Sequence, residues 1–355
     1  MITYIYIKNI QNINSRGVEL IFNESQNVIL GLNASGKSNI LKSLEFFKQL
    51  ILNEKILELS PYRFSENNRG SEIKVIFKIN KIYYRYQMKF YFDLLEVVYK
   101  EEYFDKSLNG KDFTSIIERN NIDVTYNNRT FDIEKNISSI KFLSLFNKSK
   151  DLTMFYNFID KNFYTISLNN IDIKDILIMS YQEKSLNNVF TILSEKLKDL
   201  QIGVQSIDVT PVLYGKRDIA LYHNDLEQLL SIDLESKGTK QLICILYYMF
   251  VLKSKVLIID EAEENIHPSI VKKLLMIFLE SKSQLIFSTH SRELIDIEIP
   301  CNRKNKKVFF TQKSCSGYVQ VTDLDRDELD INIKDDIYRS YYLDLFNSYA
   351  NRINI

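Results

Sequence analysis

Residues 31–38 read Gly-Leu-Asn-Ala-Ser-Gly-Lys-Ser, and this stretch decides the fold. A glycine, four residues and then Gly-Lys-Ser is the pattern of a loop whose backbone N–H groups surround phosphates. An apolar run at 27–30 precedes the loop, and a run with helical spacing follows it from 39 to 47. We therefore predict a strand, a phosphate-binding loop and a helix whose N-terminus points at the phosphates.

The side chains of this loop have separate expected roles. Lys37 is predicted to reach the β- and γ-phosphates, and the hydroxyl of Ser38 to ligate Mg²⁺. Asn33, Gly36 and Asn39 are predicted to bind nucleotide with them. The alternative is a Gly/Ser turn that carries a lysine by coincidence, and the strand and helix around the loop disfavour it.

A second informative stretch is 256–261, Val-Leu-Ile-Ile-Asp-Glu. The apolar run predicts a buried parallel strand, which would place both acids at the carboxyl edge of the sheet, beside the phosphates. Asp260 would hold Mg²⁺ through its water shell, and Glu261 would orient and polarise the attacking water. A buried strand that ends in two solvated acids is the alternative, and the upstream loop disfavours it.

A histidine follows the next apolar run, 284–288. His290 can sense a γ-phosphate by hydrogen bonding if that run is a strand of the same sheet. A lone histidine is more often structural. The position of His290, 30 residues beyond Asp260, favours the functional interpretation.

A fourth stretch is 236–240, Ser-Lys-Gly-Thr-Lys, which opens a predicted buried helix over 241–252. Ser236, Gly238 and Thr239 would present N–H donors and a hydroxyl to an anion. In isolation, the stretch would be interpreted as an N-cap.

Composition limits the classes of function. The 355 residues are 45% hydrophobic, and 46 Lys and Arg balance 46 Asp and Glu, which disfavours a protein that mainly coats nucleic acid with positive charge. Cys244, Cys301 and Cys315 form no Cys-x-x-Cys pair, so neither a disulfide framework nor a zinc site is expected. Neither a signal segment nor a membrane-length apolar run is apparent, and we expect a cytoplasmic protein without membrane contact.

The remaining patterns predict an α/β fold of the P-loop NTPase class. It would have a mixed sheet, an antiparallel β subdomain and a helical insertion. We expect an N-terminal half at 1–104, a mainly helical insertion or lid at 105–200, and a C-terminal half at 201–355. The expected elements are an antiparallel strand pair at 2–7 and 18–22, a meander over 72–99 that turns at 80–81, strands near 203–212 and 218–222 with a turn at 215–216, and a helix from Pro268 to about 279.

In this order and spacing, the four motifs resemble those of ABC-type ATPases of the RecF/SMC/OLD group, most specifically over 1–60 and 225–300. The run 261–268 (EAEENIHP) and the ending 341–346 (YYLDLF) look like a narrower branch, the bacterial AAA-15/AAA-21 ATP-binding proteins. Many members of that branch belong to anti-phage or abortive-infection systems.

The resemblance implies that Ser236, Gly238 and Thr239 complete the ATP site of a second copy. Two ATP molecules with Mg²⁺ would then lie between two heads, in a homodimer or a higher even oligomer. Lys37, Glu261 and His290 would be the catalytic residues. The leading hypothesis is an ATP-hydrolysing head that acts as sensor or regulator in anti-phage defence, with a toxin or nuclease effector encoded nearby.

A second hypothesis is an ATP-gated DNA- or RNA-binding clamp without its own nuclease. Arg303, Lys304, Lys306 and Lys307 could support nucleic-acid binding, but a solvated loop is the favoured interpretation of that run.

A third hypothesis makes the chain itself a nuclease through Asp323 and Asp325, where an acid-rich loop is favoured instead. Only 65 residues follow His290, too few for a TOPRIM domain. No segment between the phosphate loop and 236–240 is identified as the glutamine-bearing loop that contacts the γ-phosphate and Mg²⁺ in the resembling ATPases. His267 is interpreted as a helix-start residue rather than a metal ligand.

Overall fold

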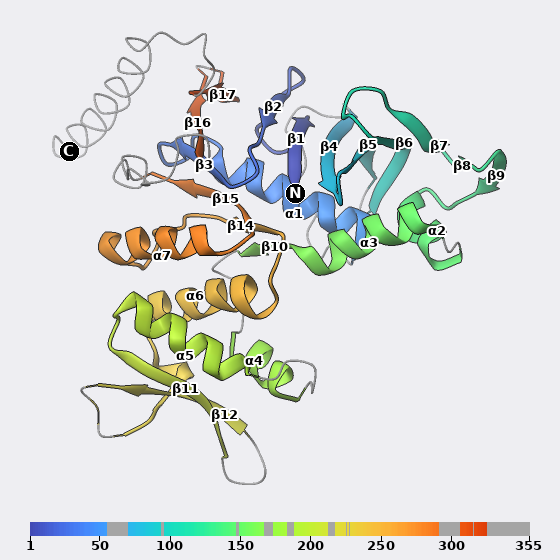
Figure 1. The fold of residues 1–355 in the computed structure, drawn as a ribbon. Coiled ribbons are helices and arrows are strands. Elements are labelled where there is room, and N and C mark those ends of the chain that lie inside the picture. Colours follow the sequence, from blue (N-terminus) through green and yellow to red (C-terminus); the bar gives the residue numbers. More distant parts are fainter. Residues whose placement is uncertain are drawn as a thin grey trace.

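The computed structural model describes residues 1–54, 70–93, 96–146, 149–166, 173–182, 188–211, 217–224, 226, 228–290, 306–314 and 316–324. A six-stranded sheet lies in the middle of the molecule. An eight-stranded sheet lies on one side of it, and helices with a small three-stranded sheet lie on the other (Figure 1).

The central sheet has the order β10-β14-β15-β3-β16-β17 and is parallel except for β17. Its strands are β10 (Phe163–Ile166), β14 (Val256–Ile259), β15 (Gln284–Thr289), β3 (Gln26–Gly31), β16 (Lys306–Lys313) and β17 (Val319–Asp323). Its middle strands β3, β14 and β15 are buried along their whole length, as expected for parallel strands covered on both faces.

Alternate residues of these strands belong to two separate cores. Ile29, Ile258 and Ile286 face the eight-stranded sheet, whereas Leu30 and Leu257 face the helices on the opposite side. This division follows from the two-residue period of a strand. It explains why the sequence of these strands is apolar at nearly every position rather than at every second one.

The eight-stranded sheet is antiparallel in the order β2-β1-β4-β5-β6-β7-β8-β9. Its strands are β1 (Ile2–Lys8), β2 (Val18–Ile21), β4 (Ser71–Ile79), β5 (Ile82–Asp93), β6 (Glu96–Ser107), β7 (Thr114–Asn120), β8 (Asp123–Tyr126) and β9 (Arg129–Asp132). The helices α1 (Lys37–Leu52), α2 (Ser139–Phe146) and α3 (Lys150–Asn162) pack in the core between this sheet and the central one.

The opposite face of the central sheet is covered by α6 (Lys237–Leu246), which continues as a π-helical turn at Tyr247–Val251, and by α7 (Pro268–Glu280). Beyond them lie α4 (Ile173–Gln182), α5 (Val189–Leu200) and the sheet of β11 (Val204–Pro211), β12 (Arg217–His223) and β13 (Leu230–Ser231) (Figure 1). A short 3₁₀ turn, Ile232–Leu234, leads into α6.

The predicted fold class is confirmed. The antiparallel pair of β1 and β2, the turn at Asn80 and Lys81, the buried strands and the helix that begins at Pro268 all form where the patterns indicated. The predicted turn at 215–216, the ending 341–346, Arg303, Lys304, Asp325, Cys301 and Cys315 lie outside the described residues.

The segment 105–200, predicted as a mainly helical insertion, contains helices α2, α3, α4 and α5 but also strands. Its first part continues the meander through β7, β8 and β9, and it later returns to the central sheet as β10. The three meander strands bury only every second side chain at most, so their apolar signal is weak. Strand β10 has only four residues, which is too short to show a period.

Within the described residues, none of the helices is long and apolar enough to cross a membrane.

Candidate nucleotide site

Three parallel strands bring the predicted motifs to one edge of the central sheet. The loop 31–38 leaves the carboxyl end of β3, Asp260 follows β14, and His290 follows β15. Because β15 lies between β14 and β3, its end stands between the loop and the acids. The carboxyl edge of a parallel sheet is where such folds bind ligands.

A chain of hydrogen bonds joins the three strand ends. Ser38 Oγ donates to Asp260 Oδ1 at 3.1 Å, and Ser288 Oγ donates to the same oxygen at 2.6 Å. The backbone N–H of Glu261 in turn donates to Ser288 Oγ at 2.7 Å. The first helical turn after the loop and the two acids are thereby held in one arrangement.

Close packing requires glycine at both Gly31 and Gly36 of the loop. A Cβ on Gly31 would lie 2.3 Å from Thr311 Oγ1, and a Cβ on Gly36 would lie 2.2 Å from Val319 Cγ2. Gly36 also has a φ of 106°, in the left-handed region that favours glycine. Strands β16 and β17, which carry Thr311 and Val319, thus fix the shape of the loop.

Lys37 is nearly buried and turns back onto its own loop. Its Nζ donates to the carbonyl of Gly31 at 2.7 Å and to that of Leu32 at 3.0 Å. Burial lowers the pKa of Lys37, while the carboxylates of Glu261, Glu263 and Asp260 oppose that shift. The ammonium group is therefore held at the loop in an acidic neighbourhood.

Glu261 has two unusual features. Its φ of 52° lies in the left-handed region, which costs a non-glycine residue roughly 1–2 kcal/mol. Burial and the neighbouring charges of Asp260 and Glu264 raise the pKa of its carboxyl, and Lys37 opposes them. A strained residue whose carboxyl has a raised pKa is typical of a functional position.

His290 is held by a residue that sequence reasoning missed. Glu263 Oε1 accepts hydrogen bonds from Thr289 Oγ1 and from the backbone N–H of His290, both at 2.8 Å. The Nδ1 atom of His290 lies 2.9 Å from the same oxygen, where it donates to the carboxylate. The imidazole is therefore oriented by an acid two residues beyond Glu261.

Ser288 was the other residue missed. It belonged to the predicted strand 284–288, but no role was assigned to its hydroxyl. The signal was its place at the end of a strand adjacent to β14, which brings its side chain beside Asp260. Detecting that contact requires the strand order, which one sequence does not supply.

The signature, which consists of Ser236, Gly238 and Thr239, lies at the start of α6. Ser236 Oγ accepts from Thr239 N–H at 3.0 Å, which is N-cap geometry. A Cβ on Gly238 would lie 2.2 Å from the carbonyl oxygen of Asn265, so the glycine lets α6 approach the segment after Glu261. Ser236 itself is exposed. No described hydrogen bond joins Ser236, Gly238 or Thr239 to the phosphate loop of the same chain.

Two asparagines of the loop region differ in their surroundings. Asn39 donates its side-chain amide to Asn12 Oδ1, which ties the start of α1 to the loop after β1. Asn33 is exposed at the tip of the phosphate loop. The predicted contacts of both with nucleotide stay predictions. His267 caps α7 by accepting from Ser269 N–H, as its helix-start interpretation required.

The oxygen atoms of Ser38 and Asp260 fit Mg²⁺. A hydroxyl and a carboxylate oxygen 3.1 Å apart are hard ligands of the kind that Mg²⁺ takes from protein when it is also bound to phosphates. The donor set would not suit a soft metal ion, because it contains no sulfur or imidazole.

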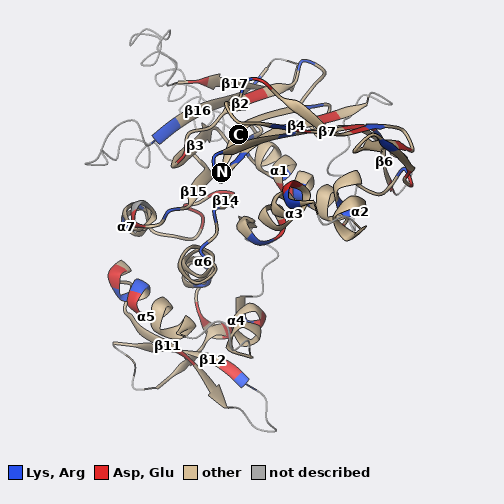
Figure 2. Ribbon diagram, turned by 45° about the vertical axis from the view of Figure 1, so that its right-hand side comes forward, with Lys and Arg blue, Asp and Glu red and all other residues tan. Residues whose placement is uncertain are grey.

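The basic run and the acidic pair proposed for other activities are only partly described. Lys307 Nζ forms an ion pair with Asp323 Oδ2 at 2.9 Å, so these two side chains engage each other between β16 and β17. Charged positions of both signs are mixed along the described elements (Figure 2). Neither observation favours a nucleic-acid clamp or a nuclease.

Comparison with known proteins supports the P-loop assignment. Residues 27–296 match a family described as "AAA domain, putative AbiEii toxin, Type IV TA system", abbreviated AAA_21. This match contains all four motifs. No curated protein sequence matches the chain.

Solved structures with a similar fold are head domains of SMC proteins. The head of Pyrococcus yayanosii, with a coiled coil and joint, is 11% identical with a TM-score of 0.57, over 96% of this chain and 99% of that one. The head of Pyrococcus furiosus, bound to the C-terminal domain of ScpA, is 14% identical with a TM-score of 0.53, over 91% and 96%. An SMC head bound to the C-winged helix domain of ScpA is 16% identical with a TM-score of 0.55, over 92% and 98%.

Proposed function

The chain belongs to the AAA_21 family, and we propose that it is a magnesium-dependent ATPase whose two copies close around two ATP molecules. The chain of hydrogen bonds from Ser38 through Asp260 and Ser288 to Glu261 carries this proposal. It gathers a phosphate-loop hydroxyl, a metal-binding acid and a general base at one edge of the sheet.

Each residue of the site has a separate role in the proposed hydrolysis. Lys37 binds the β- and γ-phosphates, and Ser38 and Asp260 hold Mg²⁺, which neutralises phosphate charge when bound. Glu261 accepts a proton from the attacking water, for which its raised pKa suits it. His290, oriented by Glu263, hydrogen-bonds the γ-phosphate.

The second copy is needed because the signature makes no described contact with the loop of its own chain. Ser236 is exposed, and Leu234, two residues earlier, is 74% exposed. These residues form a face that a second copy would cover. ATP would contact both halves only in the closed state, so its binding would shift the population toward that state.

The biological role proposed is that of sensor or regulator in an anti-phage system. The family description names a toxin and a toxin–antitoxin system, and the SMC heads bound to ScpA domains are relatives in fold that bind a partner protein. The ATP-dependent dimer would hold or release a toxic or nucleolytic effector according to its nucleotide state.

The test uses Glu261→Gln, which keeps the size of the side chain but removes the base. This variant should bind ATP, lose turnover by at least about 100-fold and accumulate as a dimer that sedimentation velocity detects. Adding Ser236→Arg should return it to a monomer that still binds ATP at its own phosphate loop. A Glu261→Gln variant that stays monomeric at saturating ATP would refute the proposed dimer.

A further inference from the structure

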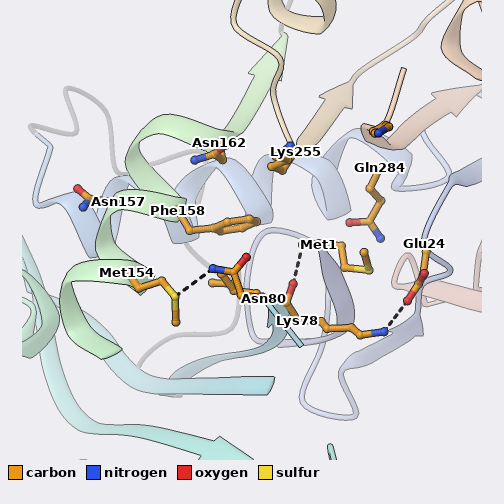
Figure 3. A pocket seen from close by; sticks show the side chains of 12 residues that line it. Met1, Glu24, Lys78, Asn80, Met154, Asn157, Phe158, Asn162, Lys255 and Gln284 are labelled. Atoms are coloured by element: carbon orange, nitrogen blue, oxygen red, sulfur yellow. Dashed lines mark hydrogen bonds and ion pairs between the residues drawn. The ribbon is translucent and has the colours of Figure 1, made fainter. Parts of the chain in front are cut away.

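A separate cavity of about 460 Å³ lies at the opposite edge of the central sheet. Its walls come from the residues before β14 and β15, from the turn between β4 and β5, and from α3 (Figure 3). Small-molecule sites in proteins have roughly 300–1,000 Å³. The cavity is therefore large enough for a ligand the size of a mononucleotide.

Strand direction separates this cavity from the nucleotide site. Lys255 immediately precedes β14 and Asp260 immediately follows it. At about 3.3 Å per residue, the strand keeps the two positions roughly 16 Å apart. Gln284 and His290 stand at the two ends of β15 in the same way. A ligand in the cavity would thus be distinct from a nucleotide at the phosphate loop.

Positive charge predominates in the cavity. Lys78, Lys255 and Lys282 line it together with a single acid, Glu24. Lys78 is already paired with Glu24 at 2.7 Å. Lys255 and Lys282 are exposed, and neither has an acidic partner among the described residues. These two lysines come from neighbouring strand starts and provide an uncompensated charge that favours an anion.

The side-chain amides of Gln284 and Asn80, which line the cavity, differ in the strength of their hydrogen bonds. Gln284 donates to the carbonyls of Ile2 and Asn23, both at 2.6 Å, so it joins the sheets and has no donor left. The amide of Asn80 donates only to the thioether of Met154 at 3.5 Å, a weak acceptor. A ligand with oxygen or nitrogen acceptors could replace that partner without cost to the fold.

An aromatic ring provides the apolar wall. Phe158 lines the cavity, and its ring is held edge-to-face by Phe77 with centroids 5.8 Å apart. In Figure 3 the ring lies between Asn80 and Lys255. A fixed ring beside the weakly bonded amide of Asn80 and the two lysines can bind a planar group that carries an anionic substituent.

We propose that this cavity binds a small phosphate monoester with a planar body, a nucleoside monophosphate being the chemical class. Its phosphate would be held by Lys255 and Lys282 and its base would pack against Phe158. Lysine suits this role because it binds phosphate as a point charge without demanding a fixed geometry. The walls belong to both large sheets, so the ligand would bridge them.

Uridine 5′-monophosphate and uridine are the matched probes, titrated calorimetrically into the full chain at low salt. The nucleotide should bind at least tenfold more tightly than uridine, and its affinity should fall as salt rises. Lys255→Ala/Lys282→Ala should lower that affinity at least tenfold. Lys100→Ala/Lys111→Ala removes two exposed lysines elsewhere and should change it less than twofold.

Three results would overturn the proposal. One is the absence of nucleotide binding at millimolar concentration. Another is an affinity that the Lys255/Lys282 double variant leaves unchanged, which would assign binding to another site. The third comes from a 5′-phosphorylated oligonucleotide: if it binds and the mononucleotide does not, the ligand is a nucleic-acid end rather than a small molecule. Thermal unfolding of both double variants confirms that they are folded.

Discussion

Two charged clusters in this molecule are built on opposite principles. In the eight-stranded sheet, Arg119 and Glu102 form an ion pair at 2.6 Å with both side chains fully buried. All five N–H donors of Arg119 have acceptors: Glu102 and the carbonyls of Asn121, Ile133, Glu134 and Ile137. Glu102 also accepts from Tyr86 and Ser139. Charge and hydrogen bonding are balanced within the chain.

The carboxyl edge of the central sheet is unbalanced by comparison. The carboxylates of Asp260, Glu261 and Glu263 all act on the ammonium group of Lys37, whose pKa they raise against the effect of burial. Glu263 Oε2 is buried with no hydrogen-bond partner in the described structure, and Glu261 has a left-handed backbone. A cluster that serves only stability would resemble the first one. The imbalance supports the proposal that the charges of the second cluster serve binding and catalysis.

The largest loss of stability is expected on breaking the buried ion pair of Arg119 and Glu102. Arg119→Met removes the cation and leaves Glu102 buried without it, which should lower the free energy of unfolding by about 3–5 kcal/mol. Urea unfolding measures this change. The control is Lys89→Ala, which breaks an ion pair with Glu101 of similar length whose members are 40% and 23% exposed.

That control should cost less than about 1 kcal/mol. Equal costs for Arg119→Met and Lys89→Ala would mean that burial does not distinguish the two pairs. Glu102→Gln combined with Arg119→Met should recover part of the loss, because the buried charge is removed as well.

The two clusters also differ in how far sequence predicts them. The proximity of the motifs at the proposed nucleotide edge could be predicted because each follows an apolar run with its own local signal. The phosphate loop with Lys37, the acid Asp260 and His290 come after the runs 27–30, 256–259 and 284–288. Glu102 and Arg119 give no such signal. They occupy the adjacent strands β6 and β7 of the meander, and they meet only because the register pairs them directly.

Sequence reasoning also missed contacts at the proposed nucleotide edge, for the same reason. Glu263 and Ser288 act through contacts that depend on the order of β14 and β15 in the sheet. It failed again for the fold where elements were short or half-exposed, as in β10 and β9. Strong local periodicity was thus predictable, whereas pairing between distant segments was not.

A moderate loss of ATP turnover is expected when Glu263 is replaced. Glu263→Gln keeps an oxygen near His290 but removes the charge that strengthens the Nδ1 hydrogen bond. Losing about 1.5 kcal/mol of that interaction corresponds to about a tenfold slower turnover of ATP, with ATP affinity changed less than twofold. Glu195→Gln, at an exposed position on α5, should leave the rate unchanged. A fall in ATP affinity equal to the fall in rate would assign Glu263 to binding instead of orientation.

The smallest expected effect is a change in stability. It tests whether the negative charge of Glu261 destabilises the folded state. Burial and Asp260 raise the pKa of Glu261 above its ordinary value of 4.5. Above that raised pKa the carboxyl is ionised in both states, so the folded state bears the full penalty. Below pH 4.5 it is neutral in both states and the penalty disappears.

Glu261→Gln should therefore raise the melting temperature at pH 7, by less than about 2 °C, and this gain should shrink as the pH falls toward 4.5. Since Gln keeps the left-handed backbone, only the charge is tested. Differential scanning calorimetry at pH 7 and pH 5 measures the gain, with Glu195→Gln on α5 as the exposed control. A gain that is equal at both pH values, or a loss of stability at pH 7, would show that the charge of Glu261 is fully compensated in the folded chain. The catalytic edge would then be balanced in the same sense as the Arg119–Glu102 pair.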